Sequence, residues 1–266
     1  MKQSKLFHLL FPFIMMAIPW VYLAFIWNDL PQTIPTHFGI KGTPDAFGPK
    51  GEVFLLPVIF SVVGVLVYFL MRNIHKIDPK KKYSDTTSTV LSKIAVVIVI
   101  LLCATALFFL YWTLHGKMEG MPVFFCGISL FLAYMGNLMH SIKPNYFAGF
   151  RLPWTLENED NWRKTHQLAS KIWFIGGLVL AVVSLILPLQ ALIIVFISSV
   201  LLMAIIPAIY SIIAGSLGWF VFGTFFTMAA AGDFLIVNLL LKEKMDDLVQ
   251  DHPSEAGFYL FRKINK

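Results

Sequence analysis

The sequence predicts an all-α membrane protein built as a bundle of about seven transmembrane helices. Its residues are 58% hydrophobic and only 14% charged, whereas a soluble domain is nearer half apolar and a quarter charged. The mean hydropathy is +0.74, and several apolar runs exceed the roughly 18 residues expected of a membrane-spanning helix. Since these runs show no strand-like alternation of apolar and polar residues, helices rather than a barrel must satisfy the backbone hydrogen bonds.

The apolar segments divide the chain into expected spans. They cover residues 6–27, 53–71, 94–114, 121–141, 172–188, 191–213 and 217–241. The first is too long for the apolar core of a signal peptide and no small-residue cleavage site follows it, so we expect it to be retained. Pro12 and Pro19 lie inside it, which membrane helices tolerate. Pro188 is expected to mark a tight turn between the fifth and sixth spans.

The charged residues predict one orientation in the cell membrane. The basic segments, expected in the cytoplasm by the positive-inside rule, are the N-terminus, 72–93 and 142–171. The segments 28–52 and 115–120 then lie outside, whereas the tail from residue 242 has balanced charges and indicates neither side. The net charge of +6 therefore reflects membrane topology, and we expect no direct binding to nucleic acid.

The same features predict the domain organisation. The expected parts are an N-terminal module, 1–71, with the outer loop 28–52; a basic cytoplasmic loop, 72–93; a bundle, 94–213, with the cytoplasmic loop 142–171; and an extra span with a polar tail, 214–266.

The loop that contains KPNYFAGFRLPWTLENEDNW, residues 143–162, is unusually rich in aromatic, polar and proline residues. Pro144 and Pro153 favour extended backbone before them, and Gly149 permits a bend between them. Thr155 is the predicted N-cap of a following amphipathic helix, whose first turns are acidic. We therefore expect an extended piece and then a helix that leads into the fifth span.

Two interpretations of this loop remain open. It is either an interfacial segment that anchors the bundle or a surface that binds a partner protein, since aromatic and arginine side chains are the usual anchors of protein interfaces. On the second interpretation the partner-binding residues are Asn145, Tyr146, Gly149, Arg151, Pro153, Trp154, Thr155, Trp162 and His166.

The outer loop 30–50 is stiffened by prolines and interrupted by glycines, so we expect it to be non-helical. It is either an ordered connector or a surface that meets an amphipathic peptide. The residues expected to carry recognition are Pro35, Thr36, His37, Phe38 and Lys50.

The cytoplasmic loop resembles the signature of the SdpI family of bacterial membrane immunity proteins. The matching residues are Lys143-Pro144-Asn145, Gly149-Phe150-Arg151, Pro153-Trp154-Thr155-Leu156 and Trp162-Arg163-Lys164-Thr165-His166. Phe150 and Leu152 depart from the commonest pattern but remain apolar. The stretch LPQTIPTHFGIKGTPDAFGPK, residues 30–50, is similar to a module of unknown function that commonly precedes this signature.

The resemblance covers roughly residues 6–211 and implies a bundle of about six spans with both ends in the cytoplasm. It also implies two partners besides the lipid bilayer: a secreted toxic peptide outside, against which the protein gives immunity, and a transcriptional repressor captured inside. These expectations come from the resemblance and not from composition.

The last segment departs from this family. Asp233 lies in an apolar run, and an ionisable group in hydrocarbon is costly enough to be a functional candidate. Alternatively, it caps a helix, pairs within the bundle or stays protonated. A small-solute transporter is therefore a competing function, with Pro188 and Pro207 as further weak indications of broken helices.

The C-terminal residues are also similar to the end of a family of membrane proteins assigned as zinc peptidases, which makes a membrane hydrolase the third hypothesis. However, the seven histidines are scattered and none are spaced i, i+4, so the HExxH zinc motif is absent. We therefore expect no catalytic residue, metal or cofactor, and a function in recognition.

Overall fold

The computed structural model describes the backbone of residues 2–79, 84–240, 248–251 and 258–261. Side chains are described for residues 7–79, without 75, and for 88–215. The chain divides into two units, Met1–Ile212 and Ile213–Lys266, and each is described by itself.

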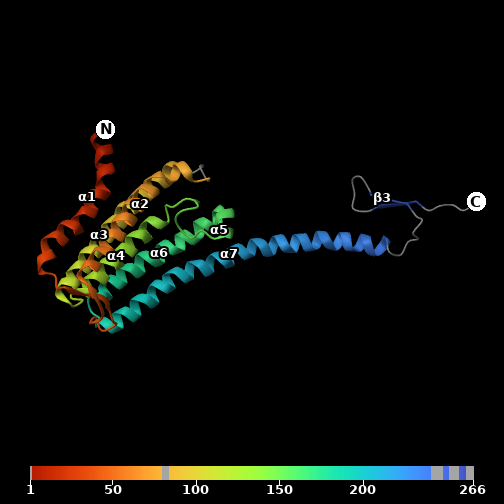
Figure 1. The fold of residues 1–266 in the computed structure, drawn as a ribbon. Helices are drawn as coiled ribbons and strands as arrows, with labels where there is room; N and C mark the ends of the chain where they lie inside the picture. The colour runs from red at the N-terminus through yellow and green to blue at the C-terminus, as the bar shows by residue number, and fades with distance from the viewer. Residues whose placement is uncertain (1, 80–83, 241–247, 252–257, 262–266) are drawn as a thin grey trace, which may run out of the picture. The chain divides into compact units, whose positions relative to one another are not determined.

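Long helices make up most of the first unit (Figure 1). The helices are α1 (Lys2–Ile26), α2 (Leu55–Ile77), α3 (Ser84–His115), α4 (Met121–Met139), α5 (Pro153–Glu157), α6 (Glu159–Ser184) and α7 (Leu189–Leu240). Short 3-10 helices lie at Trp27–Asp29 (η1) and Lys50–Phe54 (η2). The strands are β1 (Thr33–Phe38) and β2 (Pro44–Pro49) and, in the second unit, the antiparallel pair β3 (Leu248–Asp251) and β4 (Phe258–Phe261).

The all-α membrane fold is confirmed. Within the described residues, six helices are long and apolar enough to cross a membrane: Phe7–Asp29, Lys50–Ile74, Ser88–His115, Met121–Met139, Glu159–Ser184 and Leu189–Gly215. Large apolar side chains point outward from them, with Phe25 80% and Leu66 63% exposed. Such surfaces are stable only against lipid or another protein.

The expected interruption at residues 214–216 is absent, because α7 continues from Leu189 to Leu240. Its only proline is Pro207, which lies well before the expected break. The seventh span, 217–241, falls on residues whose side chains are outside the described part, and it stays a prediction.

Two helix ends differ from the sequence prediction. Most of the expected loop 72–93 is helical, because α2 continues to Ile77 and α3 begins at Ser84. The fifth span and its amphipathic approach form the single helix α6. Hydropathy identifies only the residues that lie inside the hydrocarbon core. A helix satisfies its own backbone hydrogen bonds and can therefore continue past the membrane surface.

Small residues allow α4 and α6 to pack closely. A Cβ atom added at Gly177 would lie 2.5 Å from the Ala133 amide nitrogen and 2.7 Å from the Ser129 carbonyl oxygen. Gly136 of α4 meets the backbone of α6 at Trp173 and Phe174 in the same way. Such small-residue contacts are a common way for membrane helices to associate, since they bring backbones together.

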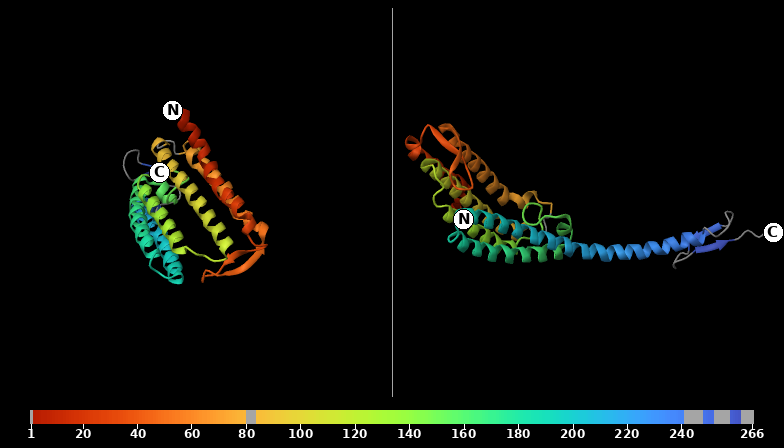
Figure 2. Two further views of the ribbon diagram at one scale, coloured as in Figure 1. Left: turned by 90° about the vertical axis from the view of Figure 1, so that its left-hand side faces the viewer. Right: turned by 90° about the horizontal axis from the view of Figure 1, so that it is seen from below.

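An antiparallel hairpin, β1–β2, covers one end of the bundle, and the loop between α4 and α6 lies at the other (Figures 1 and 2). The segment 30–50 is non-helical up to the start of η2 at Lys50, as expected, but its two strands were not predicted. Ile34 in β1 is fully buried and packs with Leu23, Ile26 and Leu110 at this end of the bundle. The hairpin is therefore an ordered part of the fold.

Candidate functional site

The candidate site is the signature loop, which we define as residues 140–158, together with the first two turns of α6. It includes the short helix α5 and otherwise has no regular secondary structure. Its apolar side chains pack on a cluster that includes Ile74 from α2, Leu91 from α3 and Leu138 from α4. The loop is thus fixed to three helices.

Asn145 organises the first half of the signature loop. It is 1% exposed. Its Oδ1 accepts from the amides of Phe147 (2.8 Å) and Ala148 (2.7 Å), and its Nδ2 donates to the carbonyls of Lys143 (2.8 Å) and Ala148 (3.1 Å). One side chain therefore replaces the backbone pairing that this segment lacks, as asparagine does in turns.

His166 joins α6 to the middle of the loop. Its Nδ1 lies 2.8 Å from the Trp162 carbonyl oxygen, and its Nε2 accepts from the Phe150 amide at 3.1 Å. These two bonds assign the neutral tautomer with the proton on Nδ1. Gly149 has φ 101°, and an added Cβ would collide with Nε2 of His166. Glycine is thus required both by its backbone conformation and by the position of the imidazole.

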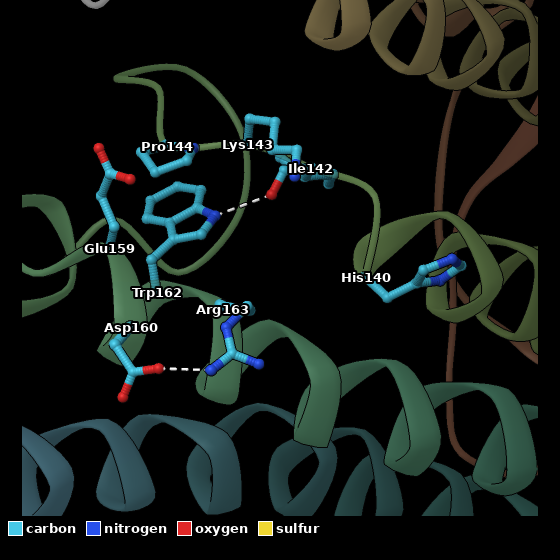
Figure 3. A pocket seen from close by; sticks show the side chains of 8 residues that line it. All are labelled: His140, Ile142, Lys143, Pro144, Glu159, Asp160, Trp162 and Arg163. Atoms are coloured by element: carbon cyan, nitrogen blue, oxygen red, sulfur yellow. Dashed lines mark hydrogen bonds and ion pairs between the residues drawn. The ribbon is translucent and has the colours of Figure 1, made fainter. Parts of the chain in front are cut away.

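Trp162 closes the interior of the site. The residue is 2% exposed and its ring stacks on His166, with centroids 4.1 Å apart and an interplanar angle of 18°. Its Nε1 donates to the Ile142 carbonyl at 2.8 Å (Figure 3). A buried indole is stable there because its only polar atom has a partner.

Thr155 is buried but is not the N-cap that the sequence predicted. Thr155 lies inside α5. Its Oγ1 donates to the Phe150 carbonyl (2.6 Å) and accepts from the Leu152 amide (3.0 Å), and both of these residues precede the helix. The cap of α6 is Asn158, whose side chain accepts from the amides of Asp160 and Asn161. Asn158 separates α5 from α6, because its extended conformation, φ −119° and ψ 108°, ends the first helix.

A second polar network joins the site to α7, and most of its members were not predicted. Trp154 Nε1 donates to Ser211 Oγ at 3.0 Å. Asn161 Nδ2 donates to the Ser211 carbonyl, and Asn161 Oδ1 accepts from Thr165 Oγ1, both at 3.0 Å. The i, i+4 spacing of Asn161 and Thr165 was the only local signal in the sequence, because the partner Ser211 is fifty residues away along the chain.

The nine predicted partner-binding residues therefore separate by exposure into a buried group, an exposed group and one half-buried residue. The interior holds Asn145, Thr155, Trp162 and His166, whereas Trp154 is half-buried. The exposed residues are Tyr146, Gly149, Arg151 and Pro153. The first group builds the loop, and only the second can meet a partner directly.

Tyr146 and Arg151 form the outward face of the loop. Arg151 Nη1 donates to the Tyr146 carbonyl at 2.8 Å, and Tyr146 is 47% exposed. Because the arginine bridges the two sides of the loop, its position is coupled to that of the tyrosine backbone.

A pocket of about 240 Å³ lies between the start of the loop and the first turn of α6 (Figure 3). Lys143 and Arg163 bring positive charge to it, and Glu159 and Asp160 bring negative charge. Asp160 pairs with Arg163 at 2.5 Å, so part of this charge is neutralised within the wall. The pocket therefore suits a partner surface that carries groups of both signs better than it suits a bare anion.

The predicted outer residues lie on and beside the hairpin. Thr36 and His37 are exposed, Phe38 is half-buried and Pro35 is buried. His37 Nδ1 lies 2.5 Å from Asp45 Oδ1 on the paired strand. The Lys50 ammonium lies 4.3 Å from the ring centroid of Trp27. Four of these five residues thus reach the surface at least in part.

The other predicted features give no second site in the described part of the chain. Asp233 is in α7, but its side chain lies outside the described residues. Among those residues, no three His, Cys, Asp or Glu side chains converge as metal ligands would. The absence of a metal and of catalysis remains a prediction.

Residues 141–211 match the SdpI/YfhL protein family, and residues 14–60 match a domain of unknown function, DUF1648. The immunity protein SdpI of Bacillus subtilis is 23% identical over 171 residues, which are 64% of this chain and 78% of that protein.

An uncharacterized protein of Archaeoglobus fulgidus is 37% identical over 59 residues, which are 22% of this chain. The match spans about a third of that archaeal relative, 32% of its length. No solved structure matches. The resemblance inferred from the sequence is thus confirmed: this multi-pass membrane protein has an SdpI/YfhL-family region at residues 141–211 and a DUF1648 region at residues 14–60.

Proposed function

We propose that this protein gives immunity to a secreted toxic peptide, which it meets at the hairpin end, and that the signature loop captures a cytoplasmic repressor. The similarity to the immunity protein SdpI supports the first part. On this proposal the protein acts by recognition and catalyses no reaction. The geometry of the two ends supports separate surfaces for the two partners.

The observation that carries the proposal is the construction of the signature loop. Its interior side chains satisfy the backbone through Asn145, Thr155 and His166, while Tyr146 and Arg151 remain on the surface. A loop that is already ordered loses little entropy on binding. Tyrosine and arginine are also the side chains most often dominant in protein interfaces.

Charge favours the cytoplasm for this end. The described basic residues here are Arg72, Lys76, Lys93, Lys143, Arg151, Arg163, Lys164 and Lys171. Basic residues at one end of a helical bundle mark its cytoplasmic side. Because α1 begins at the same end as α3 and α6, the N-terminus is cytoplasmic on this proposal.

At the hairpin end, a mostly apolar pocket of about 560 Å³ lies among Tyr22, Phe108, Tyr111 and Glu119. The hairpin turn reaches this region, since the Met118 amide donates to the Gly42 carbonyl at 3.4 Å. Aromatic walls with one carboxylate fit an apolar peptide that carries a positive charge. We therefore assign toxin recognition to this pocket and to the exposed residues of β1.

The test uses cells that lack their own SdpI and are challenged with the peptide against which SdpI protects. Expression of this chain should restore survival. Survival that is unchanged by its expression, both with that peptide and with culture fluid from this chain's own source organism, would contradict the immunity function.

The loop is tested separately, by recovery of the repressor with membranes after the same challenge. Tyr146→Ala and Arg151→Ala should reduce recovery, whereas Lys171→Ala, an exposed cation of α6 outside the loop, should not. Normal recovery by Tyr146→Ala together with Arg151→Ala would move the capture surface elsewhere while leaving immunity in place.

A further inference from the structure

A second polar cavity, of about 450 Å³, lies at the signature-loop end of the bundle but on other helices. It opens where α1 begins, α2 ends, α3 begins and α4 ends. Neither the signature loop nor the hairpin contributes to its wall, so the proposed partner surfaces do not account for it.

The wall of this cavity has an excess of positive charge. Arg72 comes from α2 and Lys93 from α3, and neither forms an ion pair with a carboxylate among the described residues. Arg72 Nη1 lies 3.4 Å from His8 Nδ1, and its guanidinium carbon lies 5.5 Å from the Tyr68 ring centroid. The arginine thus lies beside an imidazole and an aromatic ring, and it keeps hydrogen-bond donors for an anion.

The face of α3 that lines the cavity changes character with depth. Thr89 and Lys93 are one turn apart, and Val97 follows after one more turn, so the three lie on one stripe. Ser92 and Val96, one turn apart on the neighbouring stripe, show the same change from a hydroxyl group to an aliphatic side chain. Over about two helical turns, roughly 11 Å, the wall passes from hydroxyl and ammonium groups to aliphatic side chains.

We propose that this cavity binds an anionic phospholipid, with its phosphate on Arg72 and Lys93 and the start of an acyl chain along Val96 and Val97. A free phosphate would satisfy the cations alone, but only a lipid also uses the apolar wall. The depth of the two cations in the membrane agrees with a lipid phosphate, because Arg72 lies near the end of the candidate span Lys50–Ile74 and Lys93 near the start of Ser88–His115. Phosphate groups occupy that level of a bilayer.

The test is native mass spectrometry of the whole chain, released from bilayers of phosphatidylcholine and phosphatidylglycerol in equal amounts. Arg72→Gln with Lys93→Gln removes both cations from the cavity. Lys76→Gln with Lys171→Gln is the matched control, since both lysines are exposed at the same end of the bundle and outside the cavity.

The unaltered chain should retain phosphatidylglycerol in preference to phosphatidylcholine. The cavity variant should lose this preference by on the order of a hundredfold, because it loses two charge-assisted bonds to one phosphate, each worth about 1.5 kcal/mol. The control should keep the preference, because Lys76 and Lys171 lie outside the cavity and make no such bond. Equal retention of the two lipids by the unaltered chain, or unchanged preference in the cavity variant, would overturn the proposal. Displacement of the lipid by millimolar inorganic phosphate or glycerol phosphate would replace it with a site for a free phosphate.

Discussion

Asn145→Ala should loosen the signature loop without unfolding the bundle. The asparagine is 1% exposed and makes four hydrogen bonds, all to the backbone between Lys143 and Ala148. Alanine removes all four and leaves two amides and two carbonyls without their partner. The spans pack through other residues, so the effect should stay local.

The size of the effect follows from those bonds. A typical intramolecular hydrogen bond contributes about 0.5–1.5 kcal/mol net, so four contribute about 2–6 kcal/mol. The lower half of this energy range applies, because the loop lies at the end of the bundle and water can replace part of the lost hydrogen bonding. A loss of about 3 kcal/mol increases local opening by on the order of a hundredfold, at 1.4 kcal/mol per factor of ten.

Hydrogen exchange followed by mass spectrometry measures this opening directly. The peptide that contains Phe147 and Ala148 should exchange faster by about two orders of magnitude, whereas peptides from α3 should not change. Asn145→Asp keeps both acceptor bonds but loses both donors, so it should fall between the alanine variant and the unaltered chain. Unchanged exchange in Asn145→Ala would refute the role of this side chain.

Three further substitutions test other parts of the fold. Asn158→Ala removes the cap of α6 and should lower stability by about 1 kcal/mol, seen as a lower melting temperature in detergent; Asn158→Ser should restore most of it. Gly149→Ala should displace His166 and abolish the protection of the Phe150 amide from hydrogen exchange. If this amide exchanges in the variant as slowly as in the unaltered chain, the strain assigned to Gly149 is contradicted. Gly177→Ala should separate α4 from α6 and cost about 1–3 kcal/mol, whereas Gly127→Ala, whose added Cβ meets nothing within 4 Å, should be neutral or stabilising.

The sequence predicts the membrane helices well because their signal is local. Apolar length alone places the spans, and the acidic residues at the start of α6 agree with its dipole. The extended backbone before Pro153 follows from the proline itself. These features depend on a few neighbouring residues, so no knowledge of the tertiary contacts is needed.

The buried polar interior of the site could not be predicted in the same way. A polar residue in a loop is normally exposed, yet Asn145 and His166 are each 1% exposed. His166 is buried because Phe150, sixteen residues earlier, supplies its hydrogen-bond partner, and Trp154 depends on Ser211 in α7. Tertiary contacts thus decide which residues of one motif support the loop and which reach its surface.

Thr155 was misassigned because Asn158 offers an equally good cap three residues later. Both residue types are favoured at helix N-termini. The choice depends on the extended conformation that Asn158 adopts, which the sequence does not reveal.

The two proposed surfaces lie at opposite ends of the bundle, so any effect of a toxin on repressor capture must pass between them. Among the described residues, only α3 contributes buried side chains to the cluster under the hairpin, to the central cluster and to the cluster under the signature loop, through Leu110, Val99 and Leu91 respectively. Because packed cores respond as units and not by gradual deformation, a shift of α3 along its axis would alter both ends at once. The proposed lipid site uses the same helix through Lys93. A phospholipid held there would stabilise one position of α3, and membrane composition would then affect repressor capture without any contact between lipid and repressor.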